Sequence, residues 1–331
     1  MAPSALLSTS PTRASSRKTI TKPTNETPTE KTALLSKPKL SAAQRFQKYL
    51  GFKTRSAYWA TLGLSIPWLF LMCINGSFDL DIEGVAKKNG QDLGILGEVW
   101  LFRPEEYLMR KAFQIHVGLF CLVGAMAIFQ FIPAIRQYSL KLHRYIGYFV
   151  LIGAVVGTGT GWFFTPPSFG GSWDENVSLY AFGLMFLIPS FISWRRIRQG
   201  KIQEHKEWAI RGMVTMGGAL TMRVMMLLTS FVIVYFGRWD GIWTCNQFLA
   251  AIEDDAWVFG NYPVCRTDVL ARIVVPATAG SDVNSAKAGR ATAYRFGFGT
   301  AMWIGMVANS YLAEYLVHRS RKNLQERSVK L

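Results

Sequence analysis

The sequence predicts an all-α protein: a polytopic transmembrane helix bundle of about six spans with two long exoplasmic loops. Half of the residues are apolar, yet the formal net charge is +16. The apolar residues gather into runs of about 18 to 24, the length that a roughly 30 Å hydrocarbon core requires of a helix. The basic residues lie mainly between these runs. This separation is typical of a membrane protein and would be unusual in a soluble domain.

Six apolar segments are predicted to cross the membrane. The fifth contains Arg223 at its middle and the sixth contains Glu314 near its end, so both are less uniform than the third. The predicted spans are Tyr58 to Asn75, Ile115 to Ile135, Tyr145 to Phe164, Val177 to Trp194, Met213 to Phe236, and Phe296 to Val317.

The orientation follows from the basic residues outside the spans. The segments on one side hold 25 Lys and Arg against 5 Asp and Glu, and those on the other side hold 11 against 15. Because Lys and Arg are retained in the cytoplasm, both termini are predicted there, in an endomembrane or plasma membrane. Topology explains the positive charge, so the lipid bilayer is the expected partner and nucleic acid is not. A second reading of the charge is attraction to anionic lipid.

The two ends of the chain are predicted to be basic cytoplasmic tails, residues 1–56 and 318–331, on either side of a membrane domain, residues 57–317. The first tail is rich in Ser, Thr, Pro, Lys and Arg, a composition typical of disorder. Its acid-free opening, residues 1–25, also resembles a mitochondrial transit peptide. Three prolines would interrupt the helix of such a peptide, so a mitochondrial location is the less expected alternative.

The long exoplasmic loops are residues 76–112 and 237–295. Cys245 and Cys265 lie in the second loop, where an oxidising compartment would allow a disulfide. Such a bond closes a loop of about twenty residues and would contribute roughly 3 kcal/mol. Asn75 and Asn176 each begin an Asn-X-Ser sequon near an exoplasmic helix end, so both are candidates for glycosylation.

Span three has a face of small residues. Gly153, Gly157 and Gly161 recur at intervals of four, which places them on one side of the helix. A neighbouring helix can approach closely along such a face. Gly159 departs from it, and the pattern predicts a packing surface.

Two polar residues are candidates for binding a ligand inside the membrane, His116 and Arg223. An arginine at the bilayer centre costs about 2.5 to 3.5 kcal/mol, so Arg223 is expected to face the bundle interior. Its partner could be helix carbonyls, His116 or a ligand carboxylate, which suits the planar fork of arginine. A purely structural role is equally consistent with the sequence.

His143 and His205 form the one histidine pair that could hold a b-type haem through two axial imidazoles. Both lie at the cytoplasmic side, whereas His116 lies on the order of 30 Å away at the other side. A second haem would therefore lack a ligand pair. The alternative reading of His143 and His205 is that they contact solvent or lipid headgroups. No other metal site is predicted.

Three short motifs carry a resemblance to a known family. They are His116; Leu142, His143 and Arg144 followed by Gly147; and His205, Arg211 and Arg223. This pattern resembles the domain-of-unknown-function 2306 family, predicted multi-helix membrane proteins of bacteria and filamentous fungi. The resemblance covers roughly residues 113–235 and implies a polytopic fold without an established activity. The long N-terminal tail and the loop between spans five and six depart from compact members.

Three classes of function remain open on the sequence. The first is an accessory or ligand-binding membrane protein for a lipophilic small molecule in a metabolic or biosynthetic pathway. The second is a membrane-embedded enzyme, either a haem-dependent redox protein or an acid-assisted cyclase or isomerase, which needs a positioned carboxylic acid. The third is a transporter, which inverted repeats or paired broken helices would favour. Neither catalytic residues nor protein partners are predicted.

Overall fold

The computed structural model describes residues 40–80 and 106–328 of the 331-residue chain. The chain divides into a part that ends at Phe46 and a second part, Gln47–Leu331, that contains the long helices. Within the described residues the elements, in chain order, are α2 (Ala42–Tyr49), α3 (Arg55–Leu80), α5 (Tyr107–Phe131), α6 (Pro133–Tyr138), α7 (Leu140–Phe164), η3 (Ser168–Gly170), α8 (Trp173–Arg198), α9 (Ile202–Met216), α10 (Gly218–Phe236), β1 (Asp240–Thr244), α11 (Cys245–Ile252), α12 (Asp255–Asn261), α13 (Val264–Thr267), β2 (Arg272–Pro276) and α14 (Val283–Ser328).

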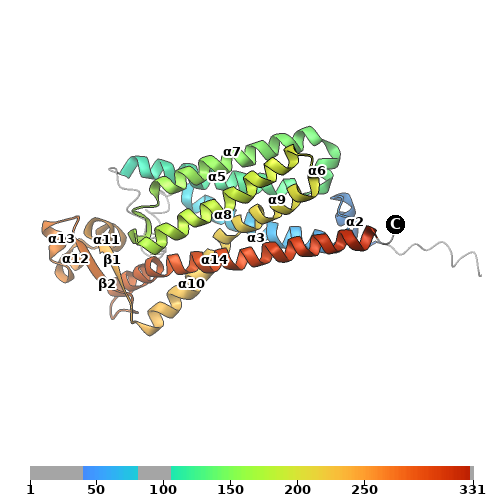
Figure 1. Ribbon diagram of the computed structural model, residues 1–331. Helices are drawn as coiled ribbons and strands as arrows, with labels where there is room; N and C mark the ends of the chain where they lie inside the picture. The colour runs from blue at the N-terminus through green and yellow to red at the C-terminus, as the bar shows by residue number, and fades with distance from the viewer. Residues whose placement is uncertain (1–39, 81–105, 329–331) are drawn as a thin grey trace, which may run out of the picture. The chain divides into compact units, whose positions relative to one another are not determined.

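Four of these helical segments are long and apolar enough to cross a membrane: α5, α7, α8 and the stretch of α9 and α10. Figure 1 shows the long helices side by side, with α5 against α7, α8 against α9, and α10 against α14. The predicted all-α membrane bundle is therefore confirmed. The first and sixth predicted spans lie inside α3 and α14. A total of six spans stays a prediction.

The predicted span boundaries need correction where helices run beyond the apolar runs. Helix α5 begins at Tyr107, eight residues before the predicted second span, and ends at Phe131, because the chain turns at Ile132 and Pro133 begins α6. The segment between the predicted fourth and fifth spans is mostly helical, since only residues 199–201 separate α8 from α9. Helices α9 and α10 are separated by Gly217 alone.

The predicted N-terminal tail is also partly ordered. Helix α2 begins after Ser41, whose hydroxyl accepts from the Gln44 N–H at 3.3 Å, while the Gln44 side chain accepts from the Ser41 N–H at 2.9 Å. This reciprocal capping box stabilises the first turn of a helix. The prediction of disorder for residues 1–56 is therefore wrong at α2. Residues 1–39 lie outside the described part of the chain, as do residues 81–105 of the first predicted long loop.

Helix α14 is much longer than the predicted sixth span. Its 46 residues correspond to about 69 Å of helix, more than twice the hydrocarbon core. Asp282 caps its start, because its carboxylate accepts from the backbone N–H groups of Asn284 and Ser285. The Ser285 hydrogen bonds hold the pKa of this carboxyl below its usual value. The second predicted loop therefore ends at Asp282, and its last thirteen residues are helical.

Residues 240–276 form a small module, here called the disulfide module, between α10 and α14. Strands β1 and β2 pair antiparallel, with Ile242 opposite Val274. Cys245 and Cys265 form the predicted disulfide, with Cα atoms 5.2 Å apart. The module packs on α14, to which the buried Trp243 donates a 3.0 Å hydrogen bond at Thr292. The disulfide prediction is confirmed, and Figure 1 places the module at one end of the bundle.

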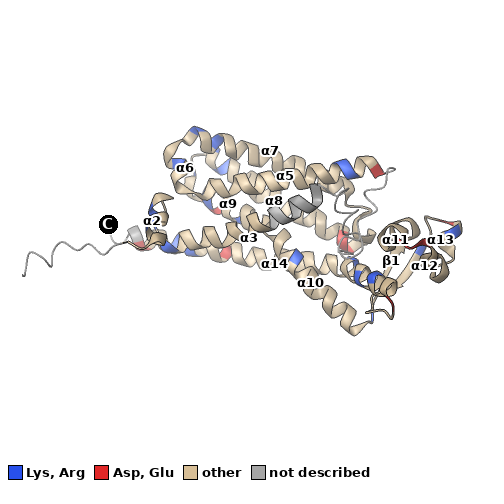
Figure 2. Cartoon of the chain, turned by 180° about the vertical axis from the view of Figure 1, so that it is seen from behind, with Lys and Arg blue, Asp and Glu red and all other residues tan. Residues whose placement is uncertain are grey.

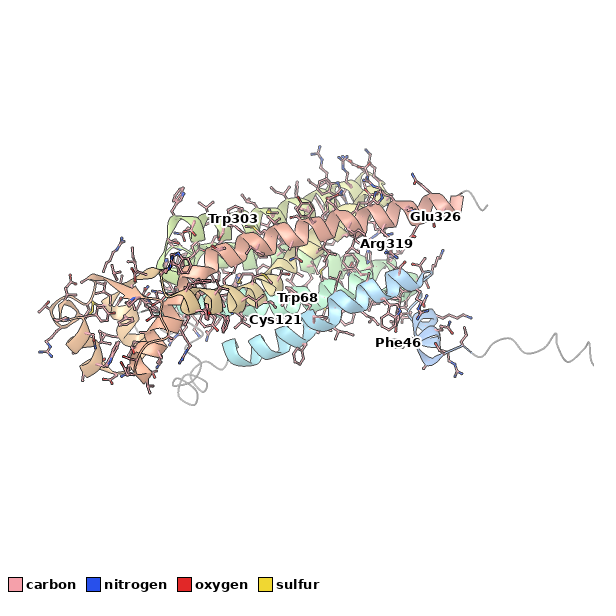
Figure 3. All side chains as sticks on the ribbon, turned by 90° about the horizontal axis from the view of Figure 1, so that it is seen from below. Phe46, Trp68, Cys121, Trp303, Arg319 and Glu326 are labelled. Carbon is pink, nitrogen blue, oxygen red and sulfur yellow. A yellow bond between two sulfur atoms is a disulfide. The ribbon has the colours of Figure 1, made fainter. Side chains whose placement is uncertain are left out.

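Two apolar cores hold the long helices together. In the first, Trp68 of α3 lies against Gly124 of α5, where a Cβ atom would meet the indole (Figure 3). The second joins α10 to α14 through buried methionines, which adapt their shape to irregular gaps; its buried members are Met222, Met226, Phe298, Ala301, Met302 and Met306.

Charge is distributed unevenly along the bundle. Figure 2 shows Lys and Arg around α6 and the start of α7, whereas the middle of α5 and α7 is almost entirely uncharged. This is the arrangement that an apolar bilayer core demands, because charged side chains are costly there.

Candidate functional site

The glycine face of α7 packs against α5 as predicted. A Cβ atom at Gly153 would meet Val123, and at Gly157 it would meet Phe120. At Gly161 it would lie 2.7 Å from Nδ1 of His116. Glycine is therefore required at position 161 for the imidazole to lie against the helix, a contact that the spacing of the glycines alone does not reveal.

His116 is fixed on α5 by this contact and by a hydrogen bond. Its Nδ1 lies 2.7 Å from the carbonyl oxygen of Gly157. A carbonyl only accepts, so we assign the proton to Nδ1 and the lone pair to Nε2. Phe120 and Phe164 pack on the ring, with centroids 4.8 and 5.3 Å away. In its neutral form, His116 therefore presents an oriented acceptor nitrogen at Nε2.

Arg223 lies in α10 at the edge of its buried face. The buried face of this helix carries Met222 and Met226, and Arg223 itself is partly buried. No side chain or carbonyl in the described parts of the chain forms a hydrogen bond or an ion pair with its guanidinium. His116 is near enough for the arginine charge to act on its imidazole. Within the described residues, no hydrogen bond or ring contact joins the two predicted ligand-binding residues, so a shared site stays a prediction.

His143 and His205 lie near the first turns of α7 and α9, and the charge of His205 acts on His143. Nδ1 of His205 lies 2.9 Å from the Ser193 carbonyl oxygen and donates to it, which leaves Nε2 with the lone pair. Nδ1 of His143 is buried and has no hydrogen-bond partner among the described residues.

The two histidine sites are separate, as predicted. His116 lies against Gly161, which is eighteen residues beyond His143 on α7, or about 27 Å along the helix. This agrees with the predicted separation on the order of 30 Å. A side chain spans far less than that, so His116 cannot share a ligand with His143.

The remaining motif residues have structural surroundings. Arg144 is exposed, and Gly147 faces Gln130 of α5, whose amide oxygen would lie 3.7 Å from a Cβ at this position. Asn75 lies in α3 and Asn176 in the first turn of α8, where its amide donates to the Gly171 carbonyl. Glycosylation of either asparagine stays a prediction.

Two arginine–glutamate pairs join α9 to α14, and the sequence did not reveal them. Arg211 donates to both carboxylate oxygens of Glu314, at 2.6 and 2.9 Å, and lies over the Trp208 ring at 4.7 Å. Glu207 accepts in the same two-pronged way from Arg321. The family-motif residue Arg211 is therefore a clamp between two helices, and Glu314 is present in the sixth predicted span as its partner.

A further buried arginine lies where the disulfide module meets α14. The Arg295 guanidinium lies 3.7 Å from the centre of the Trp243 ring, and its Nη2 donates to Gln247 at 2.8 Å. The side chains of Arg295, Trp243 and Gln247 are all buried. Cation–π stacking and a hydrogen bond offset much of the cost of burying this charge. The contact anchors the module to the bundle.

Long apolar helices and charged residues near their ends are typical of a multi-pass helical membrane protein. Residues 113–252 match the family model of DUF2306, described as a predicted membrane protein. This match confirms the resemblance found in the sequence motifs, and it runs from α5 to the end of α11. No curated protein and no solved structure matches the chain.

Proposed function

We propose that this membrane protein binds a lipophilic small molecule with an acidic head group inside its helix bundle, at Arg223 and His116. The observation that carries the proposal is the guanidinium of Arg223 in a membrane-spanning stretch, without an ion-pair partner in the described residues. His116, within electrostatic range, cannot neutralise it because a neutral imidazole carries no negative charge.

A bound carboxylate would supply the missing charge. Burying an unpaired arginine costs about 2.5 to 3.5 kcal/mol, and a two-pronged hydrogen bond to a carboxylate offsets that cost. Nε2 of His116 would accept a hydrogen bond from a hydroxyl on the same ligand. The aromatic rings around His116 and the apolar helix faces suit a hydrocarbon tail.

Binding is favoured over acid-assisted catalysis by the positions of the buried carboxylates. Among the described residues these belong to Glu175 and Glu207. Glu175 accepts hydrogen bonds from Ser172 in the capping box of α8, and Glu207 is held by Arg321 and Gln203. Each of these carboxylates is engaged in a structural contact. Neither is therefore a good candidate for a proton donor to a ligand at Arg223. Transport would be favoured by a pair of broken helices, whereas among the described stretches that can cross a membrane only the one formed by α9 and α10 is divided, at Gly217.

The test is a binding measurement on full-length protein in detergent micelles, with a fluorescent sixteen-carbon fatty acid as the probe. Arg223→Met should weaken binding at least tenfold, since it removes the charge and keeps the volume. Arg223→Lys should also weaken it, because a lysine cannot make the two-pronged contact. Arg238→Met, at an exposed position just beyond α10, is the matched control and should change nothing. Equal affinity of Arg223→Met and wild type would refute the proposal.

We also infer that the protein lies in an endomembrane or plasma membrane with both termini in the cytoplasm. The support is the excess of 25 over 11 basic residues on one side of the predicted spans.

A second candidate function is electron transfer through one b-type haem held by His143 and His205. The observation that favours it is the hydrogen bond from Nδ1 of His205 to the Ser193 carbonyl. Ligating histidines commonly donate their other ring nitrogen to a backbone carbonyl, which orients the ring and leaves Nε2 for the metal. His143 lies on a different helix, and the charge of His205 acts on it, which supports two axial ligands from two helices.

A visible absorption spectrum of the purified protein tests this candidate. A bis-imidazole haem band in the wild type should disappear in His143→Ala and in His205→Ala. It should persist in His318→Ala, because His318 is exposed near the end of α14. A colourless protein after expression with a haem supply would eliminate electron transfer by this pair.

A further inference from the structure

A groove lies between α8, α9 and α14, and its lining contains no histidine. Its cavity volume is about 280 Å³, and its lining is mostly apolar. Ile188 of α8, at its mouth, is 52 % exposed. Because α8 and α9 belong to stretches that can cross a membrane, a groove with an exposed Ile188 would face lipid.

One end of the groove carries both signs of charge. Arg211 and Glu314 line it and bind each other through Nε and Nη2 of the arginine. The two N–H groups of Nη1 are left over from this pairing, since Glu314 occupies the other edge of the guanidinium. The Glu314 side chain is 61 % exposed, so its carboxylate keeps acceptor capacity for a second cation.

The apolar wall of the groove contains one more acceptor. Pro189 lies inside α8 and lines the groove together with Met185. Proline has no N–H, so the carbonyl of Met185, four residues earlier, loses its helical hydrogen-bond donor. A carbonyl in that position can accept a hydrogen bond from a ligand.

We propose that this groove binds a membrane phospholipid whose headgroup carries a phosphate and a primary ammonium group. The phosphate meets Nη1 of Arg211, and the ammonium group meets Glu314 and the Met185 carbonyl. The cavity holds the headgroup and the first part of one acyl chain, and the rest of the lipid lies along Ile188. An anionic lipid without an ammonium group would leave Glu314 facing a second negative charge.

The proposal is tested by native mass spectrometry of full-length protein released from vesicles of equal parts phosphatidylethanolamine and phosphatidylglycerol. We expect retained phosphatidylethanolamine to exceed phosphatidylglycerol at least threefold. Glu314→Gln should abolish this preference, because it removes the charge that selects the ammonium group. Adding inorganic phosphate should not displace the lipid, since phosphate alone lacks the ammonium group and the acyl chains.

The matched pair Ile188→Trp and Leu184→Trp separates the groove from the rest of the lipid-facing surface. Both residues are exposed on α8, one helical turn apart, and only Ile188 lines the groove. Ile188→Trp should reduce retained phosphatidylethanolamine at least fivefold, whereas Leu184→Trp should leave it unchanged. Equal retention by the two variants, or no preference in the wild type, would overturn the proposal. Loss of fatty-acid binding in Arg223→Met bears on the other site alone.

Discussion

At the scale of single residues, the contact between His116 and Gly161 decides how α5 and α7 meet. The ring occupies the space that a side chain at position 161 would need, and its Nδ1 is bonded to the Gly157 carbonyl. The same α7 helix carries Gly159 on its exposed side, where a Cβ atom would meet nothing within 4 Å. Two glycines two residues apart therefore have opposite tolerance for a methyl group.

Gly161→Ala is expected to destabilise the protein by about 1 to 3 kcal/mol. The added methyl group would lie 2.7 Å from Nδ1 of His116, and overpacking of a core costs about this much. The imidazole would also have to leave the Gly157 carbonyl. Thermal unfolding of the purified protein, followed by tryptophan fluorescence, measures the effect.

Gly159→Ala is the control for this substitution. It should leave stability unchanged or raise it by up to about 1 kcal/mol, because alanine is the better helix former. Equal losses for the two variants would show that the His116 contact is not what restricts position 161.

At the scale of elements, α9 and α14 are joined by two arginine–glutamate ion pairs. Helix α9 contributes Glu207 and Arg211, and α14 contributes Glu314 and Arg321, so each helix presents one charge of each sign to the other. This pattern fixes the register of the two helices, since a shift by one turn would place like charges together. It also explains how an acidic residue is tolerated near the end of the sixth predicted span.

A double-mutant cycle with Arg211→Met and Glu314→Gln should give a coupling free energy of about 1 kcal/mol. Exposed ion pairs contribute about 0.2 to 1 kcal/mol, and this one belongs at the upper end because it is two-pronged and Arg211 is 17 % exposed. Thermal stability of the four proteins at low ionic strength provides the measurement.

The pair of Arg196 and Glu204, which joins α8 to α9, serves as the comparison. Both of its side chains are more exposed than Arg211, at 34 % and 43 %, and its single contact is 3.1 Å long. Its coupling should stay below about 0.5 kcal/mol and vanish in 1 M salt, where the screening length is about 3 Å. A stronger coupling here than at Arg211 would contradict the clamp interpretation.

At the scale of the whole molecule, the family match and the apolar helices coincide. Residues 113–252 contain most of α5 and the whole of the other three stretches that can cross a membrane. Helices α3 and α14 lie outside the match. The predicted orientation places residues 199–201 in the cytoplasm and the disulfide module on the opposite side.

Engineered glycosylation sites test this orientation in microsomal membranes. Pro263→Thr creates an acceptor sequon at the exposed Asn261 of the disulfide module, and the protein should gain one glycan. The double variant Gln199→Asn, Lys201→Thr creates a sequon between α8 and α9 and should gain none. A glycan on the second site would show that the predicted orientation is inverted.

The sequence by itself determined the membrane class, the approximate places of the helices, the glycine face and the disulfide. These follow from local properties: the length of an apolar run, the spacing of glycines and the separation of two cysteines. It also singled out His116, Arg223, His143 and His205 as the polar residues to explain. The sequence prediction assigned α2 to a disordered tail, because the composition of residues 1–56 is typical of disorder. The capping box that begins this short helix is a weaker signal.

Only the tertiary structure decided which polar groups meet. Arg211 and Glu314 are 103 residues apart, and nothing along the chain selects one glutamate over another. The same holds for Ser193 beside His205, for Gly161 beneath His116 and for the groove at Ile188. A helix span is set by how its own residues partition between water and lipid, whereas a side-chain partner is set by the packing of several helices at once.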